Sequence, residues 1–237
     1  MADPVAGHPE PPVAAGSEFV VDGEPDWRER AVSRSLVAAR SRAEQRVQRF
    51  LDAAVELIDE KGSTDFTIQE VVERSKQSLR GFYEYFSGKD ELVLALFEET
   101  VREAVVDIQA AVDAETDPLA RLRAFAITLH EWCDPGESPR KRGSHSRRPI
   151  SEFSMHLAAN HADRVGAALR PQTRLLRELI SAAAESGAIH TTDVRRATTL
   201  VQQTVMYSWF GNRLVEKPER KLDAQTTWEF CLHGLQA

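Results

Sequence analysis

The sequence predicts an all-α protein, with a small N-terminal three-helix domain followed by a larger helical domain. From Val47 onward, apolar residues recur at the i, i+3, i+4 and i+7 spacing of amphipathic helices. Residues that cap helices stand where these stripes begin, and strand signals are absent throughout. A chain of 237 residues is also long enough to bury a sizeable core.

The composition narrows the classes of function. The net charge of −7 means that any contact with nucleic acid must come from a local patch. Two cysteines, Cys133 and Cys231, give no disulfide framework and suit a reducing compartment. The N-terminus lacks the pattern of a signal peptide, and no apolar run is long enough to span a membrane. We therefore expect a cytoplasmic protein without a membrane partner.

The N-terminal part begins with residues 1–25, which are rich in Pro, Ala and Gly and are predicted to form a disordered arm. Arginines then accumulate between Arg28 and Arg49 as a basic extension. An amphipathic helix follows from Val47 to about Lys61, where Gly62 stops it. We expect the N-terminal domain to cover residues 26–95 and the larger domain residues 96–237.

Two short helices and a long one come next. Thr67 and Glu70 form a capping box that starts the second helix, and Ser78 caps the third. Ser87 and Asp90, again at capping-box spacing, are predicted to start a fourth helix that runs to about Ala114. The third helix concentrates aromatic residues, and its apolar stripe is Leu79, Phe82, Tyr83 and Phe86. Phe82 and Phe86 are expected to point into the small core, and Tyr83 and Tyr85 to lie at its rim.

The rest of the chain is also predicted to be helical. Asp117 and Pro118 start a helix that runs through Trp132. Residues 134–149 contain no apolar residue other than proline and are predicted to form a loop. Helices are then expected at 150–162, 163–187, 192–216 and 223–235, with Pro171 as a possible kink.

Short helices joined by tight turns and followed by a long helix are typical of a helix-turn-helix module. The segment TIQEVVERSKQSLRGFYEYFSGKDELVLALFEE, residues 67–99, resembles the DNA-binding domain of the TetR family of transcriptional repressors. The resemblance covers roughly residues 43 to 100. It departs at the turn, where Ser75-Lys76 replaces the usual Ala-Gly, so Lys76 must adopt a left-handed conformation or a different turn. The residues that match are Thr67, Ser78, Tyr83, Tyr85, Phe86, Lys89 and Leu92, with Phe82 in place of leucine.

The resemblance implies a double-stranded DNA operator as a partner. Phosphate contacts are implied for Thr67, Ser78, Tyr83, Tyr85 and Lys89. Base contacts are implied for Gln69, Leu79, Arg80 and Glu84, with close backbone approach at Gly81. For Arg80, a guanine contact and a phosphate contact both remain open, and burial is open for Tyr83. The arginine-rich extension is interpreted as a solvated helix face or as an arm that reaches DNA.

The resemblance also implies a homodimer, formed by the last two helices, and a pocket for a small effector. The dimer stripe on the first of these helices is Ala197, Leu200, Val201, Val205 and Trp209. The candidate pocket residues are rings and flexible side chains that suit an apolar or aromatic molecule. They are Phe125, Leu129, Trp132, Phe153, Met155, Met206, Tyr207 and Phe210.

Other classes were weighed against a regulator. The sequence has no phosphate-binding glycine loop, nucleophile elbow or HExxH motif, so neither an enzyme nor a cofactor is predicted. His130 and Cys133 share a helix face, but nothing shows that they meet Cys231 and His233, so no metal site is predicted. A helical interaction protein that has lost operator binding remains the alternative, since Glu84 is acidic. The basic loop at 140–148 is interpreted as solvated, with DNA or an acidic partner as alternatives.

Overall fold

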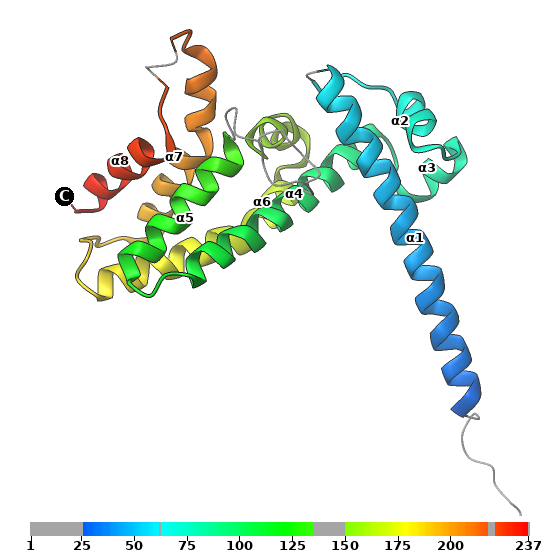
Figure 1. Cartoon of the computed structure of the whole chain (residues 1–237), viewed down its shortest axis with the longest axis horizontal. Coiled ribbons are helices and arrows are strands. Elements are labelled where there is room, and N and C mark those ends of the chain that lie inside the picture. The colour runs from blue at the N-terminus through cyan, green and yellow to red at the C-terminus, as the bar shows by residue number, and fades with distance from the viewer. Residues whose placement is uncertain (1–25, 62, 135–149, 218–220, 237) are drawn as a thin grey trace, which may run out of the picture. The chain divides into compact units, whose positions relative to one another are not determined.

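The computed structural model describes residues 26–61, 63–134, 150–217 and 221–236 (Figure 1). Within these ranges the regular elements are all helices, which confirms the predicted all-α class. The predicted arm at 1–25 and nearly all of the predicted loop at 134–149 lie outside the described residues. The helices are α1 (Asp26–Lys61), α2 (Ile68–Ser75), α3 (Leu79–Tyr85), α4 (Lys89–Asp113), α5 (Pro118–Cys133), α6 (Ile150–Glu185), α7 (Val194–Leu214) and α8 (Ala224–Gln236).

The first helix is longer than the apolar stripe predicted. It begins at Asp26, because residues 26–46 contain neither glycine nor proline and are rich in the good helix formers Ala and Arg. The arginine-rich extension is therefore helical. The chain divides into two units at Glu44, so the extension before Gln45 is one unit and the remaining helices form the other.

The N-terminal helices share a small aromatic core. Phe50 of α1 packs edge-on against Phe82 of α3 at 5.5 Å and against Phe86 at 6.1 Å between ring centroids. Val71 and Val72 bury the inner face of α2. This core holds α2 and α3 at a fixed angle to α1, which is the geometric requirement of a helix-turn-helix module.

The larger helical part begins within α4. The predicted boundary at residues 95 and 96 falls inside this helix, so one continuous helix joins the two predicted domains. Helix α5 packs against α4, α6, α7 and α8, and so lies at the centre of this part. In α6, non-helical backbone angles occur at His161 (φ −136°, ψ 37°), close to the predicted break at 162 and ten residues before Pro171.

Candidate nucleic-acid interface

Helix α2 begins with the predicted capping box. The Thr67 hydroxyl oxygen accepts a hydrogen bond from the Glu70 backbone N–H at 3.2 Å, and the Glu70 carboxylate accepts one from the Thr67 backbone N–H at 2.7 Å. Two of the backbone donors that a helix start leaves unpaired are satisfied in this way. The Thr67 side chain is exposed at this helix end, where a phosphate contact is expected.

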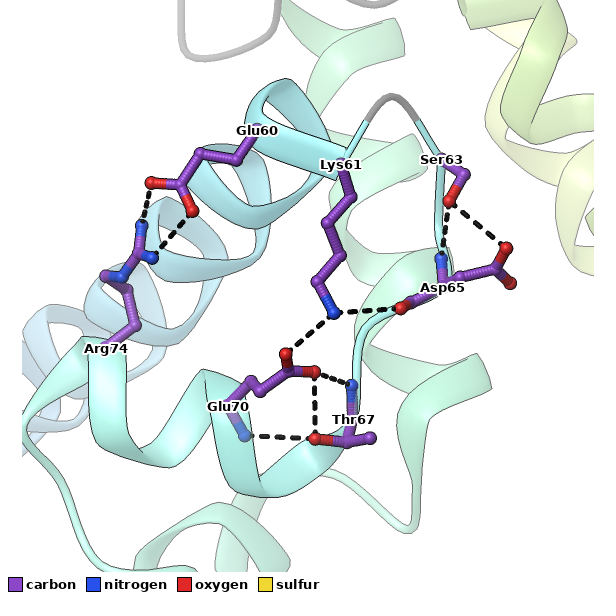
Figure 2. Close-up of polar contacts among 7 residues, drawn as sticks. All are labelled: Glu60, Lys61, Ser63, Asp65, Thr67, Glu70 and Arg74. Atoms are coloured by element: carbon purple, nitrogen blue, oxygen red, sulfur yellow. Dashed lines mark hydrogen bonds and ion pairs between the residues drawn. The ribbon is translucent and has the colours of Figure 1, made fainter.

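Two ion pairs fasten α2 to the end of α1 (Figure 2). Lys61 Nζ lies 2.7 Å from Glu70 Oε1. The Lys61 ammonium, followed by the backbone and hydroxyl donors of Thr67, lowers the pKa of Glu70 to about 2, so this carboxylate is ionised at neutral pH. At the other end of α2, the Arg74 guanidinium binds both carboxylate oxygens of Glu60, at 2.7 and 2.8 Å. A two-point contact of this kind fixes orientation as well as distance.

The turn between α2 and α3 settles the question raised by Lys76. Its backbone is left-handed, with φ 55° and ψ 39°, and it is the non-glycine residue with positive φ in the described part of the chain. The Lys76 N–H donates to Glu73 O at 3.3 Å and the Gln77 N–H donates to Val72 O at 3.2 Å. These bonds close α2 in the manner of a C-terminal cap that glycine usually forms.

Helix α3 turns only part of its apolar stripe towards the core. Phe82 is fully buried, whereas Leu79 and Tyr83 are 45% and 55% exposed, which decides the burial that the sequence left open for Tyr83. The reason is that α3 has only seven residues and turns a single side, centred on Phe82, towards Phe50. Leu79 and Tyr83, four residues apart, lie together on the outer side. Helix α3 thus presents the features of a recognition helix, the helix that enters the DNA major groove.

The polar residues of α3 and α2 also face outward. The Arg80 side chain is 91% exposed and lies 3.6 Å from the Glu84 carboxylate, an ion pair that solvent weakens. On α2, the exposed Gln69 amide donates to Glu73 at 2.9 Å. These side chains are therefore accessible to a ligand as large as a DNA duplex.

Ser78 and Gly81 form the start of α3. The Ser78 hydroxyl caps the helix by accepting from the Gly81 N–H at 3.0 Å. A β-carbon on Gly81 would lie 3.1 Å from the Ser78 hydroxyl oxygen, which is tighter than most such contacts. The glycine therefore leaves room for the cap, a role that the sequence did not predict.

Tyr85 and Lys89 sit at the end of the module. The Tyr85 ring is half-buried against the core. Lys89 is the first residue of α4, and its ammonium lies 5.0 Å from the centre of the Phe66 ring, in a cation–π contact. Lys89 is thus held at a helix N-terminus, where the backbone also favours an anion.

The start of α4 differs from the prediction. Asp90 does not cap Ser87. Glu91 accepts both the Ser87 backbone N–H at 2.7 Å and its hydroxyl at 2.6 Å, because Gly88 inserts one extended residue before the helix. These two bonds lower the pKa of Glu91, with a smaller contribution from the positive charge of Arg164. Arg164 of α6 lies 3.8 Å from Glu91 and 3.1 Å from Glu98.

The link through Arg164 was missed in the sequence. Glu91 and Arg164 are 73 positions apart, and neither stands in a motif. Only the packing of α6 against α4 brings them together.

The candidate effector residues fall into separate groups. Phe125, Leu129, Trp132 and Met206 are buried in the helical core. Tyr207 and Phe210 are each 45% exposed on the outer side of α7, so they do not join that interior group. The side chains of Phe153 and Met155 lie outside the described residues.

Helix α7 has two apolar sides. Ala197, Val201, Val205 and Trp209 of the predicted dimer stripe are buried within the chain, so that stripe is intramolecular except at Leu200. The exposed apolar residues of the outer side recur at helical spacing and are Leu200, Tyr207, Phe210 and Leu214. A groove of about 430 Å³ lies between α7 and α8, with Tyr207, Leu222 and Phe230 in its wall.

The residues considered for a metal site lie in the helical interior. His130, Cys133 and Cys231 are buried, and no cluster of three metal-binding side chains occurs in the part of the chain that the structure describes. Burial lowers the pKa of His130, against the opposing effect of nearby carboxylates. None of the described helices is long and apolar enough to cross a membrane.

Comparisons with known proteins agree with this geometry. Residues 50–96 match the family model of bacterial regulatory proteins of the tetR family. The chain is 33% identical to the HTH-type transcriptional regulator BetI of Brucella anthropi over 80 aligned residues. These residues make up 34% of this chain and 41% of BetI. The alignment thus spans about two fifths of the curated relative. Residues 50–96, which hold the helix-turn-helix module, are therefore similar to the bacterial regulatory proteins of the tetR family.

Solved structures extend the likeness of fold to most of the chain. FadR from Bacillus subtilis in complex with stearoyl-CoA has a TM-score of 0.59 at 16% identity, covering 80% of this chain and 97% of FadR. AibR in complex with isovaleryl coenzyme A and operator DNA has a TM-score of 0.55 at 16% identity, covering 81% of this chain and 98% of AibR. About four fifths of the chain therefore has the fold of these two structures.

Proposed function

We propose that this protein is a transcriptional repressor that binds a near-palindromic operator as a homodimer and is released by a small effector. The observation that carries the proposal is the outer side of α3. Its buried side is anchored by Phe82, while Arg80 and Tyr83 stand exposed on a short, capped helix. A protein that reads chromosomal DNA acts in the bacterial cytoplasm, so the predicted location follows from this function.

The phosphate contacts are assigned to the rim of the module. Two accessible polar side chains lie near the end of α3, Tyr83 within the helix and Lys89 after it. The exposed start of α2 at Thr67 offers a third phosphate contact. Arg80 supplies the base contact, because its side chain is 91% exposed and can bind guanine O6 and N7 together. A contact of this kind gives about 1–3 kcal/mol of discrimination between bases.

Dimerisation is supported by the outer side of α7. Exposed apolar residues that continue over several turns of a helix usually mark a protein interface. A second copy of the chain would cover this side together with Phe230 of α8, which is 71% exposed. In a two-fold dimer the recognition helices must lie about 34–36 Å apart to enter successive major grooves.

The effector is assigned to the interior of the larger helical part. Beside Met206, the buried Gln172 donates through Nε2 to the Met206 sulfur at 3.7 Å, but its Oε1 has no hydrogen-bond partner among the described residues. An unpaired buried acceptor costs about 1–3 kcal/mol. An apolar or aromatic effector with a hydroxyl or amide donor would relieve that cost and favour the state that binds it.

Arg164 supports a route between effector and DNA. It joins α6 to Glu91, and Glu91 holds the Ser87 backbone just after the recognition helix. A shift of α6 on effector binding would therefore reach the end of α3 through two polar contacts. An effector that binds the protein and leaves its operator affinity unchanged would contradict this mechanism.

The test is a gel-shift titration with DNA from upstream of the protein's own gene, supported by a selection of bound fragments from the whole genome. Lys89→Ala and Tyr83→Phe should weaken a specific shift, because each removes one phosphate contact. Lys221→Ala removes the same charge at an exposed position before α8 and should leave the shift unchanged. If neither experiment yields a bound fragment, the interaction protein without operator binding replaces this proposal.

A further inference from the structure

Helix α1 has opposite charges at its two ends. Residues 26–49 contain seven arginines and three acidic residues, a net charge of +4. Residues 50–61 contain four acidic residues and one lysine, a net charge of −3. A charged run on a surface helix is usually just solvated, so its place relative to the recognition helix decides whether it has a function.

Two contacts place the junction of these charges beside the recognition helix. Gln77, in the turn before α3, donates through its side-chain amide to the Arg46 backbone carbonyl at 2.8 Å. One turn further along α1, Phe50 packs against Phe82 inside α3. The stretch from Arg46 to Phe50 therefore follows α3 from the turn that precedes it to its buried centre.

Arg46 and Arg49 lie on one side of this stretch. They are three residues apart, which places them as neighbours on a helix surface, and both side chains are exposed. Phe50 beside them is buried, and Val47 between them packs against the core. The two guanidinium groups therefore stand at the rim of the helix-turn-helix module, on the side of the turn that leads into α3.

Two cations of the module already have carboxylate partners. Lys61 is paired with Glu70, and Arg74 is paired with Glu60. Negative carboxylates on α2 and α3 would repel a phosphate backbone, so additional positive charge is needed where the duplex approaches. Guanidinium groups suit this role, because their planar donors match two phosphate oxygens at once.

We propose that Arg46 and Arg49 bind DNA phosphates that flank the groove entered by α3, and so supply affinity that does not depend on base sequence. This inference depends on the proposed DNA-binding function. It adds to that function a second contact element, on α1, outside α2, α3 and the start of α4.

The experiment measures the affinity of the full chain for a random-sequence duplex between 50 and 200 mM salt. This duplex needs no knowledge of the operator, because phosphate contacts are independent of sequence. The test variant combines Arg46→Ala with Arg49→Ala. The matched control combines Arg174→Ala with Arg177→Ala, which removes equal charge from two exposed residues at the same spacing on α6.

Each phosphate contact contributes about 0.9 to the slope of log affinity against log salt, so the test variant should lose about 1.8 per bound protomer. Over this fourfold salt range, its salt-induced loss of affinity should be about 12-fold smaller than that of the wild type for each bound protomer. The control should keep the wild-type slope. A variant with Arg46→Lys and Arg49→Lys should also keep it, because the charges remain.

The possible failures are distinct. The α1 contact would be overturned if the test variant kept the wild-type salt slope, or if the control lost as much of the slope as the test variant. The proposed function would not be affected, because Lys89→Ala tests the helix-turn-helix module separately. A wild-type protein that binds neither this duplex nor genomic fragments would overturn the proposed function and the α1 contact together. Circular dichroism of each variant identifies any loss of folding. If the double alanine variant does not fold, the single variants Arg46→Ala and Arg49→Ala decide the case, because each should lose about 0.9 of the slope and a wild-type slope in both would overturn the contact.

Discussion

The left-handed residue at the turn of the module gives the sharpest prediction about stability. Lys76 has φ 55° and ψ 39°, a conformation that costs a residue with a β-carbon about 1–2 kcal/mol. Lys76→Gly removes this cost but gives the unfolded chain more freedom, which is worth about 0.5–1 kcal/mol. The expected net gain in the free energy of unfolding is about 0.5–1 kcal/mol.

Lys76→Ala is the matched control. It removes the same charge from the same exposed position but keeps the β-carbon, and therefore keeps the backbone strain. Neither variant alters the backbone bonds from Lys76 to Glu73 and from Gln77 to Val72. The difference in stability between the two variants thus reports on the strain at this turn less the greater freedom of glycine in the unfolded chain.

The measurement is urea unfolding followed by circular dichroism at a fixed protein concentration, because a dimer's stability depends on concentration. Lys76→Gly should raise the midpoint relative to Lys76→Ala with an unchanged slope, and should raise Tm by roughly 1–4 °C. Both variants should show equal salt dependence in DNA binding. Equal stability of the glycine and alanine variants would refute the assignment of strain at this turn.

Three further outcomes are expected. Because the pKa of Glu70 is lowered from 4.5 to about 2, its ionised form stabilises the fold above about pH 4.5 and loses this effect as pH falls towards 2. Glu70→Gln should therefore reduce the fall of Tm between about pH 4.5 and 2. If Tm falls as steeply in this variant as in the wild type, other carboxylates cause the fall. A double-mutant cycle of Arg164→Ala and Glu98→Ala, measured by urea unfolding, should give a coupling free energy of about 0.2–1 kcal/mol. A coupling of zero would mean that this ion pair does not stabilise the packing of α6 on α4. Phe230→Asp should give a folded monomer in analytical ultracentrifugation. Position 230 is exposed in the single chain and tolerates a carboxylate there, whereas a dimer interface would bury that charge. A dimer that persists would place the interface elsewhere.

Local chemistry explains what could be predicted from the sequence. The capping box of Thr67 and Glu70, the cap at Ser78 and the start of α5 at Pro118 depend on residues three or four positions apart, and all three occur in the structure. The conflict at Lys76 was also visible, because a β-carbon has few ways to close such a turn. The resemblance to the tetR family followed from the same short-range pattern of caps and rings.

Side-chain burial was less predictable, because helical spacing does not tell which apolar side faces the core. The stripe of α3 left the burial of Tyr83 open, and the structure exposes it, since Phe82 and Phe86 are the rings that meet Phe50. On α7, Tyr207 and Phe210 were grouped with the interior although they lie on the outer side.

The sequence by itself determined the helical class, the capped helix-turn-helix module and its resemblance to the tetR family, because each depends on contacts within a few residues of the chain. Only the tertiary structure decided the contacts between distant helices. Arg164 meets Glu91 because α6 packs on α4, and Arg46 lies beside the recognition helix because Gln77 reaches its carbonyl. Such pairs leave no periodic trace in the sequence, since their separation along the chain is set by the path of the fold.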